Sequence, residues 1–159
     1  MFTKILINIL LFYAILIVIN IPAPFLGLNF ENDSNKTAWY ALPDFLIPLV
    51  WFVLFTLLGI ARYFVVESAE AYYSKLLIGL GILCAAYAYY TLGLESLTGI
   101  SALWFGLAGN IAVILYTAFV VWSLYRVVPA AAFLTVPVVI WTSFATLIVL
   151  AELKDAKLL

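Results

Sequence analysis

The stretch ISALWFGLAGNIAVILYTAFVVWSLYRVV (residues 100–128) carries one charged residue, Arg126, and as a helix it is long enough to cross the hydrocarbon core of a bilayer. The rest of the 159-residue chain has the same character, because 68% of the residues are hydrophobic and only 9% are charged. A soluble domain of this size leaves much of its surface in water and cannot hide so much apolar area. The sequence therefore predicts a multi-pass integral membrane protein, in the cell membrane if the source is prokaryotic.

Charged residues mark the ends of four further apolar runs. The first run follows Lys4 and could be a signal peptide, but it is long and Asn20–Pro24 makes a poor cleavage site, so we expect a retained span. The fold class predicted is an all-α integral membrane protein, a single domain over residues 1–159 with a bundle of five transmembrane helices. The expected spans are residues 5–28, 45–66, 71–94, 100–128 and 130–153.

Charge and composition exclude several kinds of function. The seven Lys and Arg residues divide four against three between the two faces, so the orientation is not set by charge. The net charge of -1 argues against a nucleic-acid partner. The absence of histidine removes the commonest general base and metal ligand, and the single cysteine, Cys84, cannot form an internal disulfide. We find no catalytic constellation, metal cluster or phosphate loop, so an enzyme with its own cofactor is not expected.

Aromatic residues recur on one face of two predicted helices. Phe55 follows Trp51 by four residues, and Trp141 and Phe144 follow Pro137 by four and seven. A proline inside a helix removes one backbone hydrogen bond and bends the helix. Two interpretations stay open: these rings pack between helices, or they line a cavity that opens beside the bend. Trp39, in the first loop, could cap such a cavity or form an ordinary interfacial turn.

Residues 136–147, VPVVIWTSFATL, resemble the last-helix signature of the TspO/MBR family, the translocator proteins or tryptophan-rich sensory proteins. The second-helix region is also similar, in the loop residues Lys36, Trp39, Tyr40, Pro43 and Asp44 and in the run from Val50 to Ala61. The resemblance implies a pocket between the helices that opens toward the first loop. It also implies that the pocket binds porphyrins or other haem-like tetrapyrroles, as a sensor or a carrier.

The ligand-binding positions that the resemblance implies are Trp39, Tyr40, Trp51, Phe55, Tyr87, Pro137, Trp141 and Phe144. Some bacterial members are reported to degrade protoporphyrin in light, and the two tryptophans implicated match Trp51 and Trp141. The chain departs from the family pattern at Val138, at residues 84–87 and at Gly109–Asn110, where an acidic residue is common. Three functions therefore compete: a tetrapyrrole sensor or carrier, a light-dependent porphyrin-degrading enzyme, and a structural membrane subunit with a degenerate pocket.

Small residues in the third predicted span suggest close helix contacts. Gly81 and Ala85 form a small-xxx-small pair, with Ala88 one turn beyond. One interpretation is a homodimer through this helix, which the resemblance also implies. The alternative is that these residues pack inside one protomer, and Gly106 and Gly109 offer the fourth span as a rival interface. The expected partners are thus the lipid bilayer, a small hydrophobic ligand such as a porphyrin, and a second copy of the chain.

Overall fold

A computed structural model describes residues 1–28, 42–43 and 45–159, and every regular element in this part of the chain is helical. The predicted site residues Trp39 and Tyr40 lie outside the described residues. The elements are α1 (Phe2–Asn20), the short 3-10 helix η1 (Pro24–Leu26), α2 (Leu46–Glu67), α3 (Ala71–Ala85), the π-helix η2 (Tyr89–Gly93), α4 (Leu94–Thr98), α5 (Ala102–Tyr125) and α6 (Pro129–Asp155).

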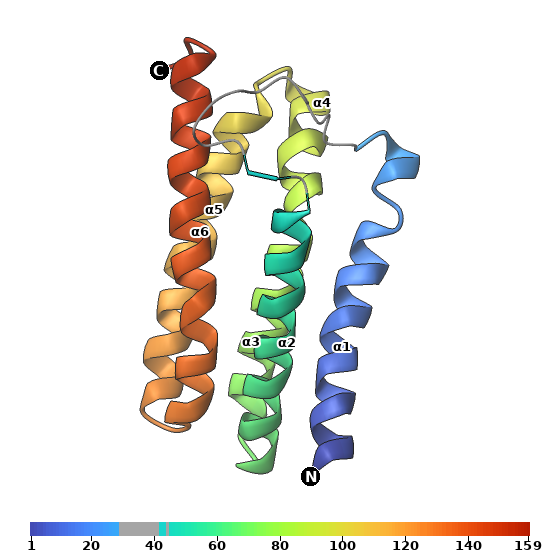
Figure 1. Cartoon of the computed structure of the whole chain (residues 1–159), viewed down its shortest axis with the longest axis vertical. Helices are drawn as coiled ribbons and strands as arrows, with labels where there is room; N and C mark the ends of the chain where they lie inside the picture. Colours follow the sequence, from blue (N-terminus) through green and yellow to red (C-terminus); the bar gives the residue numbers. More distant parts are fainter. Residues whose placement is uncertain (29–41, 44) are drawn as a thin grey trace.

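The segment Phe2–Leu26 and the helices α2, α5 and α6 are each long and apolar enough to cross a membrane. They lie close to the predicted spans and run along one another in a bundle (Figure 1). The continuous helix predicted over residues 71–94 is wrong, because this part of the chain is a pair of helical pieces bent by 59°. Counting the bent pair as one span gives five passes, and the two ends of the chain lie at opposite ends of the bundle (Figure 1).

The break after α3 is held by the upper end of α1. The Asn20 side-chain amide donates to the carbonyl oxygen of Ala85, the last residue of α3, at 3.1 Å. The Tyr89 hydroxyl, at the start of η2, donates to the carbonyl oxygen of Ile19 at 2.6 Å. A helix end inside a bilayer must find partners for its backbone groups within the protein, because lipid offers none. The break is therefore a feature of the contact between α1 and α3, which local hydropathy does not encode.

The lower half of α1 is held against α2 by close packing and by polar contacts. A Cβ at Gly59 would come within 2.6 Å of the Ile9 Cα, so the two backbones meet where α2 has no side chain. One turn below, Arg62 donates from Nε to the Ser74 hydroxyl at 3.0 Å and from Nη1 to the Asn8 side-chain oxygen. This guanidinium thereby joins α1, α2 and α3 inside the bundle.

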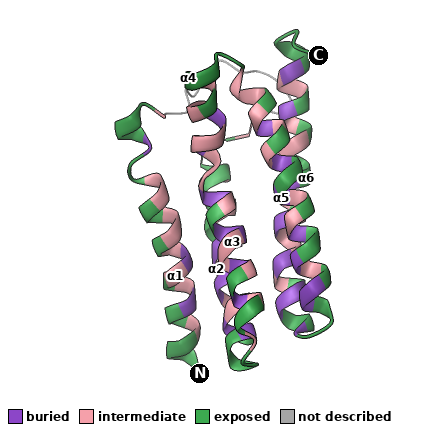
Figure 2. Cartoon of the chain, turned by 180° about the vertical axis from the view of Figure 1, so that it is seen from behind, coloured by how far each residue is buried: buried purple, intermediate pink, exposed green. Residues whose placement is uncertain are grey.

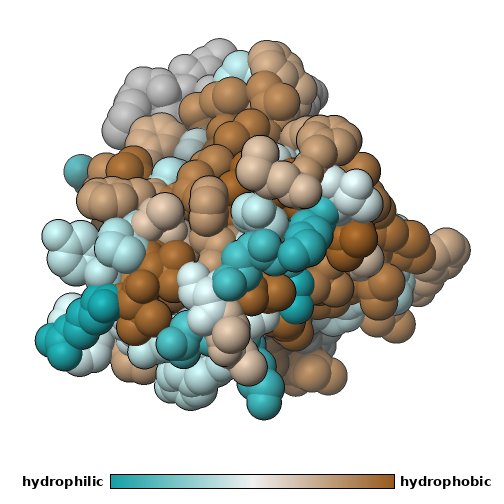
Figure 3. Space-filling view, turned by 90° about the horizontal axis from the view of Figure 1, so that it is seen from below, coloured by the Kyte–Doolittle hydropathy of each residue, from teal (hydrophilic) through white to brown (hydrophobic). Residues whose placement is uncertain are grey.

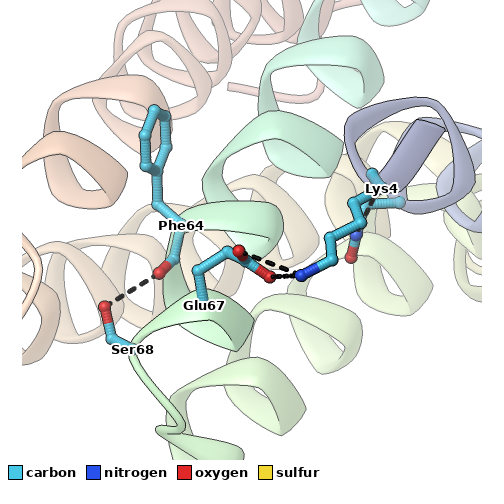
Figure 4. A network of polar contacts seen from close by, with 5 residues as sticks. Lys4, Phe64, Glu67 and Ser68 are labelled. Carbon is cyan, nitrogen blue, oxygen red and sulfur yellow. Dashed lines mark hydrogen bonds and ion pairs between the residues drawn. The ribbon is translucent and has the colours of Figure 1, made fainter. Parts of the chain in front are cut away.

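An ion pair adds to this contact at the end of the bundle where α1 begins. Lys4 lies 2.8 Å from a carboxylate oxygen of Glu67, the last residue of α2 (Figure 4). Hydrophilic side chains gather on this end of the molecule among hydrophobic ones (Figure 3). Both side chains are substantially exposed, so the pair adds little to stability compared with the buried contacts above it.

The core is a cluster of buried apolar side chains contributed by all five long helices, including Phe12, Phe55, Leu77, Val120 and Ala131. The helices α5 and α6 form the largest interface in the bundle, and α2 contacts both α1 and α6. Exposed residues cover much of the outside of the helices (Figure 2), and many of them are large and apolar. That pattern is expected when lipid tails are the solvent.

The small residues of α3 pack inside the protomer. Gly81 and Ala85 are buried, and a Cβ at Gly81 would lie 2.8 Å from the Phe12 ring of α1. On α5, Gly106 faces the Tyr87 hydroxyl and Gly109 faces the Tyr90 ring. Internal packing, the alternative interpretation of the sequence, therefore accounts for all four positions.

Candidate ligand-binding site

Two of the predicted rings on α2 lie on its core side. Phe55 is completely buried, and its ring meets the Trp51 ring edge-to-face with centroids 6.1 Å apart. Phe12 of α1 meets Phe55 from another direction, with an edge-to-face geometry and a centroid separation of 6.2 Å. Trp51 is partly buried and packs against the core cluster. The upper part of α2 thus presents one continuous aromatic surface to the inside of the bundle.

The predicted residues of α6 lie on the neighbouring helix. Trp141 is partly buried and packs against the same core cluster as Trp51. Its ring lies 5.7 Å from that of Phe144, which is 40% exposed and so reaches the outer surface. Pro137 lies inside α6, one turn before Trp141. The structure therefore brings Trp51, Phe55 and Trp141 to one core, with Phe144 at its edge.

Tyr87 lies at the break between α3 and η2. Its ring meets that of Tyr90 edge-to-face at 5.4 Å, and its hydroxyl lies where a Cβ at Gly106 of α5 would be only 2.9 Å away. Glu152, near the end of α6, is close enough to interact electrostatically with it. Tyr87 therefore lies where the bend meets α5 and α6.

Three buried polar atoms in this half of the bundle have no hydrogen-bond partner among the described residues: Tyr90 Oη, Asn110 Nδ2 and Thr142 Oγ1. Asn110 is 4% exposed and Thr142 is 3% exposed. Other threonines in the same helices donate to the carbonyl four residues earlier, as Thr117 does at 2.6 Å and Thr135 at 2.8 Å. A buried polar group without a partner costs about 1–3 kcal/mol, and lipid cannot supply one.

These three atoms lie at nearly the same depth. The Tyr90 ring packs against Gly109, which precedes Asn110 on α5. The helices α5 and α6 are antiparallel neighbours joined by a tight turn centred on residue 127. Asn110 precedes that centre by 17 residues (127 − 110) and Thr142 follows it by 15 (142 − 127), so their levels differ by about 3 Å along the bundle. Trp141 is adjacent to Thr142, so the polar atoms share the level of the aromatic residues.

Sequence reasoning did not select Tyr90, Asn110 or Thr142 as site residues. Asn110 carried the strongest available signal, because an amide inside a membrane span is costly and usually has a function. Thr142 gave no such signal, since most threonines in helices satisfy their hydroxyl locally. Only the three-dimensional packing separates Thr142 from Thr135, which lies seven residues earlier on the same helix.

The described residues include no group of three or more His, Cys, Asp or Glu side chains that could hold a metal ion. What the site offers is an aromatic surface next to buried hydroxyl and amide groups. Such a surface can bind a flat apolar molecule by contact area and ring stacking, while the polar atoms bind its polar substituents.

The helices, the apolar exterior and this internal aromatic site define a multi-pass α-helical membrane protein. Among known families, the TspO/MBR family matches residues 14–151. Because the match covers most of the 159 residues, the chain belongs to the TspO/MBR family. Comparisons with curated proteins and with solved structures gave no match. Membership of this family indicates a function of the tetrapyrrole-binding sensor or transporter kind in the membrane.

Proposed function

We propose that the protein binds a porphyrin or a related tetrapyrrole between α2, α5, α6 and the bent pair, as a membrane sensor or carrier. The observation that carries the proposal is the group of unpartnered polar atoms on Tyr90, Asn110 and Thr142. These atoms have no hydrogen-bond partner among the described residues and lipid offers none, which is costly unless another molecule binds them. All three groups can donate a hydrogen bond, so they suit a ligand with acceptor atoms such as carboxylates.

The aromatic residues suit the rest of such a ligand. A porphyrin is a large planar ring system, and Trp51, Trp141, Tyr87 and Phe144 offer ring faces and edges for it to contact. The Phe55 ring packs edge-to-face against Trp51. Pro137 has no backbone N–H, so one hydrogen bond of α6 is missing one turn before Trp141. Trp39 and Tyr40 belong to the proposal through the family resemblance of the first loop.

Entry of so large a ligand requires the helices to part, because Trp51 and Trp141 pack against the core. We infer that they part at the bend between α3 and η2, where the third span is interrupted. A π-helix is an irregular and frequently functional element, and the bend is held to α1 by the hydrogen bonds of Asn20 and Tyr89. We therefore propose that ligand binding shifts the bent pair relative to α1.

Replacing Thr142 with valine should stabilise the ligand-free protein and weaken porphyrin binding. Valine has nearly the same shape and removes an unpartnered hydroxyl, so the free energy of unfolding should rise by about 1 kcal/mol. The affinity for protoporphyrin IX should fall about fivefold, the effect of one lost hydrogen bond. Thermal unfolding in detergent and an absorbance titration with protoporphyrin IX measure the two quantities.

The matched control is Thr135→Val on the same helix, where the hydroxyl already donates to the Ala131 carbonyl. That variant should leave the affinity unchanged and should not be more stable than the unmodified protein. If Thr142→Val and Thr135→Val behave alike in both measurements, the unpartnered hydroxyl does not mark a ligand site. Illumination of the loaded protein with analysis of the products then separates binding from porphyrin degradation.

We propose the homodimer as a second point, with an interface on the outward face of α3, because Phe12 of α1 packs against Gly81 and Ala85 is buried. Ile82 is 45% exposed and lies on that outward face. In a Cys84→Ala background, the variant Ile82→Cys should form a disulfide-linked dimer under mild oxidation in membranes. The control is Ile140→Cys in the same background, because Ile140 is 65% exposed on α6, and this variant should give much less cross-linked dimer. Equal cross-linking at both positions would show random collision instead of a specific α3 interface.

A further inference from the structure

An apolar groove of about 530 Å³ lies on the outer surface of the α5–α6 hairpin, away from the site described above. Its lining is almost entirely hydrocarbon or aromatic: Ala118, Val121, Trp122, Tyr125, Val136 and Val139. At 3.6 residues per turn, Trp141 lies about half a turn around α6 from the direction midway between Val136 and Val139. The groove and the tetrapyrrole site therefore lie on opposite sides of α6.

The groove starts at one membrane face and runs inward. Trp122 and Tyr125 are 56% and 59% exposed at the end of α5, the position where aromatic residues meet the lipid headgroups. Ala118 lies about 10 Å along α5 from Tyr125, and Val139 lies about 15 Å along α6 from Pro129, where that helix begins, which is roughly the thickness of one leaflet's hydrocarbon. The length and depth of the groove thus match the upper part of a single acyl chain.

A positive charge lies at the mouth of the groove. The Arg126 guanidinium stacks over the Trp122 ring, 4.1 Å from its centroid. Stacking on the face of the guanidinium leaves its N–H groups free at the edges, where they can donate to two oxygens of a phosphate. No carboxylate among the described residues forms an ion pair with Arg126. The charge is therefore available to an anion at headgroup level.

We propose that this groove binds one anionic phospholipid, with an acyl chain between α5 and α6 and the headgroup phosphate on Arg126. Charge complementarity favours an anionic lipid over a zwitterionic lipid or a second copy of the chain. A zwitterionic lipid would bring a second positive charge close to Arg126. A second copy of the chain would need a carboxylate at this face to neutralise Arg126. Among the described residues there, Glu67 is already paired with Lys4, and a dimer that uses Glu70 is the alternative that the groove-filling variants below detect.

The experiment is native mass spectrometry of the full chain released from mild detergent, after addition of dioleoyl phosphatidylglycerol or dioleoyl phosphatidylcholine. The unmodified protein should retain one phosphatidylglycerol about fivefold more strongly than one phosphatidylcholine, the effect of a single cation at the headgroup level. Arg126→Gln should abolish the preference, while Lys75→Gln, which removes an exposed cation from α3 at the same face, should preserve it.

Two further variants test the groove itself. Ala118→Phe fills it from α5 and Val139→Phe fills it from α6, and each should lower the binding of both lipids at least fivefold. An unchanged preference in Arg126→Gln, an equal loss in Lys75→Gln, or full binding in both filled variants would overturn the proposal. Conversion of a dimer to a monomer by the filled variants would also overturn it, because the occupant would then be a second copy.

Discussion

Protoporphyrin IX should bind about 30-fold more weakly when Trp51 and Trp141 are both replaced with leucine. Both rings pack against the same core, Trp141 is adjacent to Thr142 with its unpartnered hydroxyl, and large aromatic residues contribute most of the energy of such contacts. Leucine keeps the positions apolar, so the bundle should still fold. The loss corresponds to about 2 kcal/mol of binding free energy, and an absorbance titration in detergent measures it directly.

Trp104→Leu is the matched control, since Trp104 is 38% exposed in the first turn of α5 and lies outside the proposed site. It should bind protoporphyrin IX as tightly as the unmodified protein. If the folded double variant keeps its full affinity, the tetrapyrrole site lies elsewhere. If Trp104→Leu loses as much as the double variant, the titration is measuring nonspecific partition into the protein–detergent complex.

Replacing Gly59 with alanine should lower the free energy of unfolding by about 2 kcal/mol. Alanine is the better helix former, so its intrinsic preference alone would stabilise α2 by up to about 1 kcal/mol. The added Cβ, however, would lie 2.6 Å from the Ile9 Cα and 2.9 Å from the Ile9 nitrogen. Backbone atoms cannot rotate away as a flexible side chain can, so α1 must move as a whole, and overpacking of this kind costs about 1–3 kcal/mol or more.

The control is Gly93→Ala, the same chemical change at a helical glycine where the nearest atom would be 3.9 Å away, an ordinary contact distance. Gly93→Ala should be neutral or slightly stabilising in thermal unfolding measured in the same detergent. Equal stability of the two variants would show that the contact between α1 and α2 at Gly59 is not essential to the bundle.

Displacement of α1 should also affect the proposed ligand site. On the same helix, the Asn20 side chain donates a hydrogen bond to the Ala85 carbonyl, and the Ile19 carbonyl accepts one from the Tyr89 hydroxyl. These bonds hold the bend that carries Tyr87 and Tyr90. Residues that touch no ligand can therefore affect affinity through the position of the bent pair. A helix in lipid is not held to its neighbours by hydrophobic burial, so a few close and polar contacts decide where α1 lies.

The sequence by itself determined the kind of protein and the position of most helices. Apolar runs bounded by charges predicted α2, α5 and α6 to within a few residues, because the length of a membrane span is set by the thickness of the bilayer. The motif around Pro137 and Trp141, taken together with the similar second-helix region, indicated the TspO/MBR family, which the match over residues 14–151 confirmed.

Tertiary structure alone decided the rest. The third span breaks where the Asn20 side chain of α1 donates a hydrogen bond to the Ala85 carbonyl. Position 81 has room only for glycine, because the Phe12 ring of α1 fills the space that a Cβ would occupy. Thr142 and Thr135 are the same residue type on the same helix, yet only Thr142 has an unpartnered hydroxyl. Hydropathy reports whether a segment prefers lipid to water, a property of the segment alone. Which side chain meets which, and which polar atom is left for a ligand, depends on neighbours distant in sequence that only the packed bundle brings together.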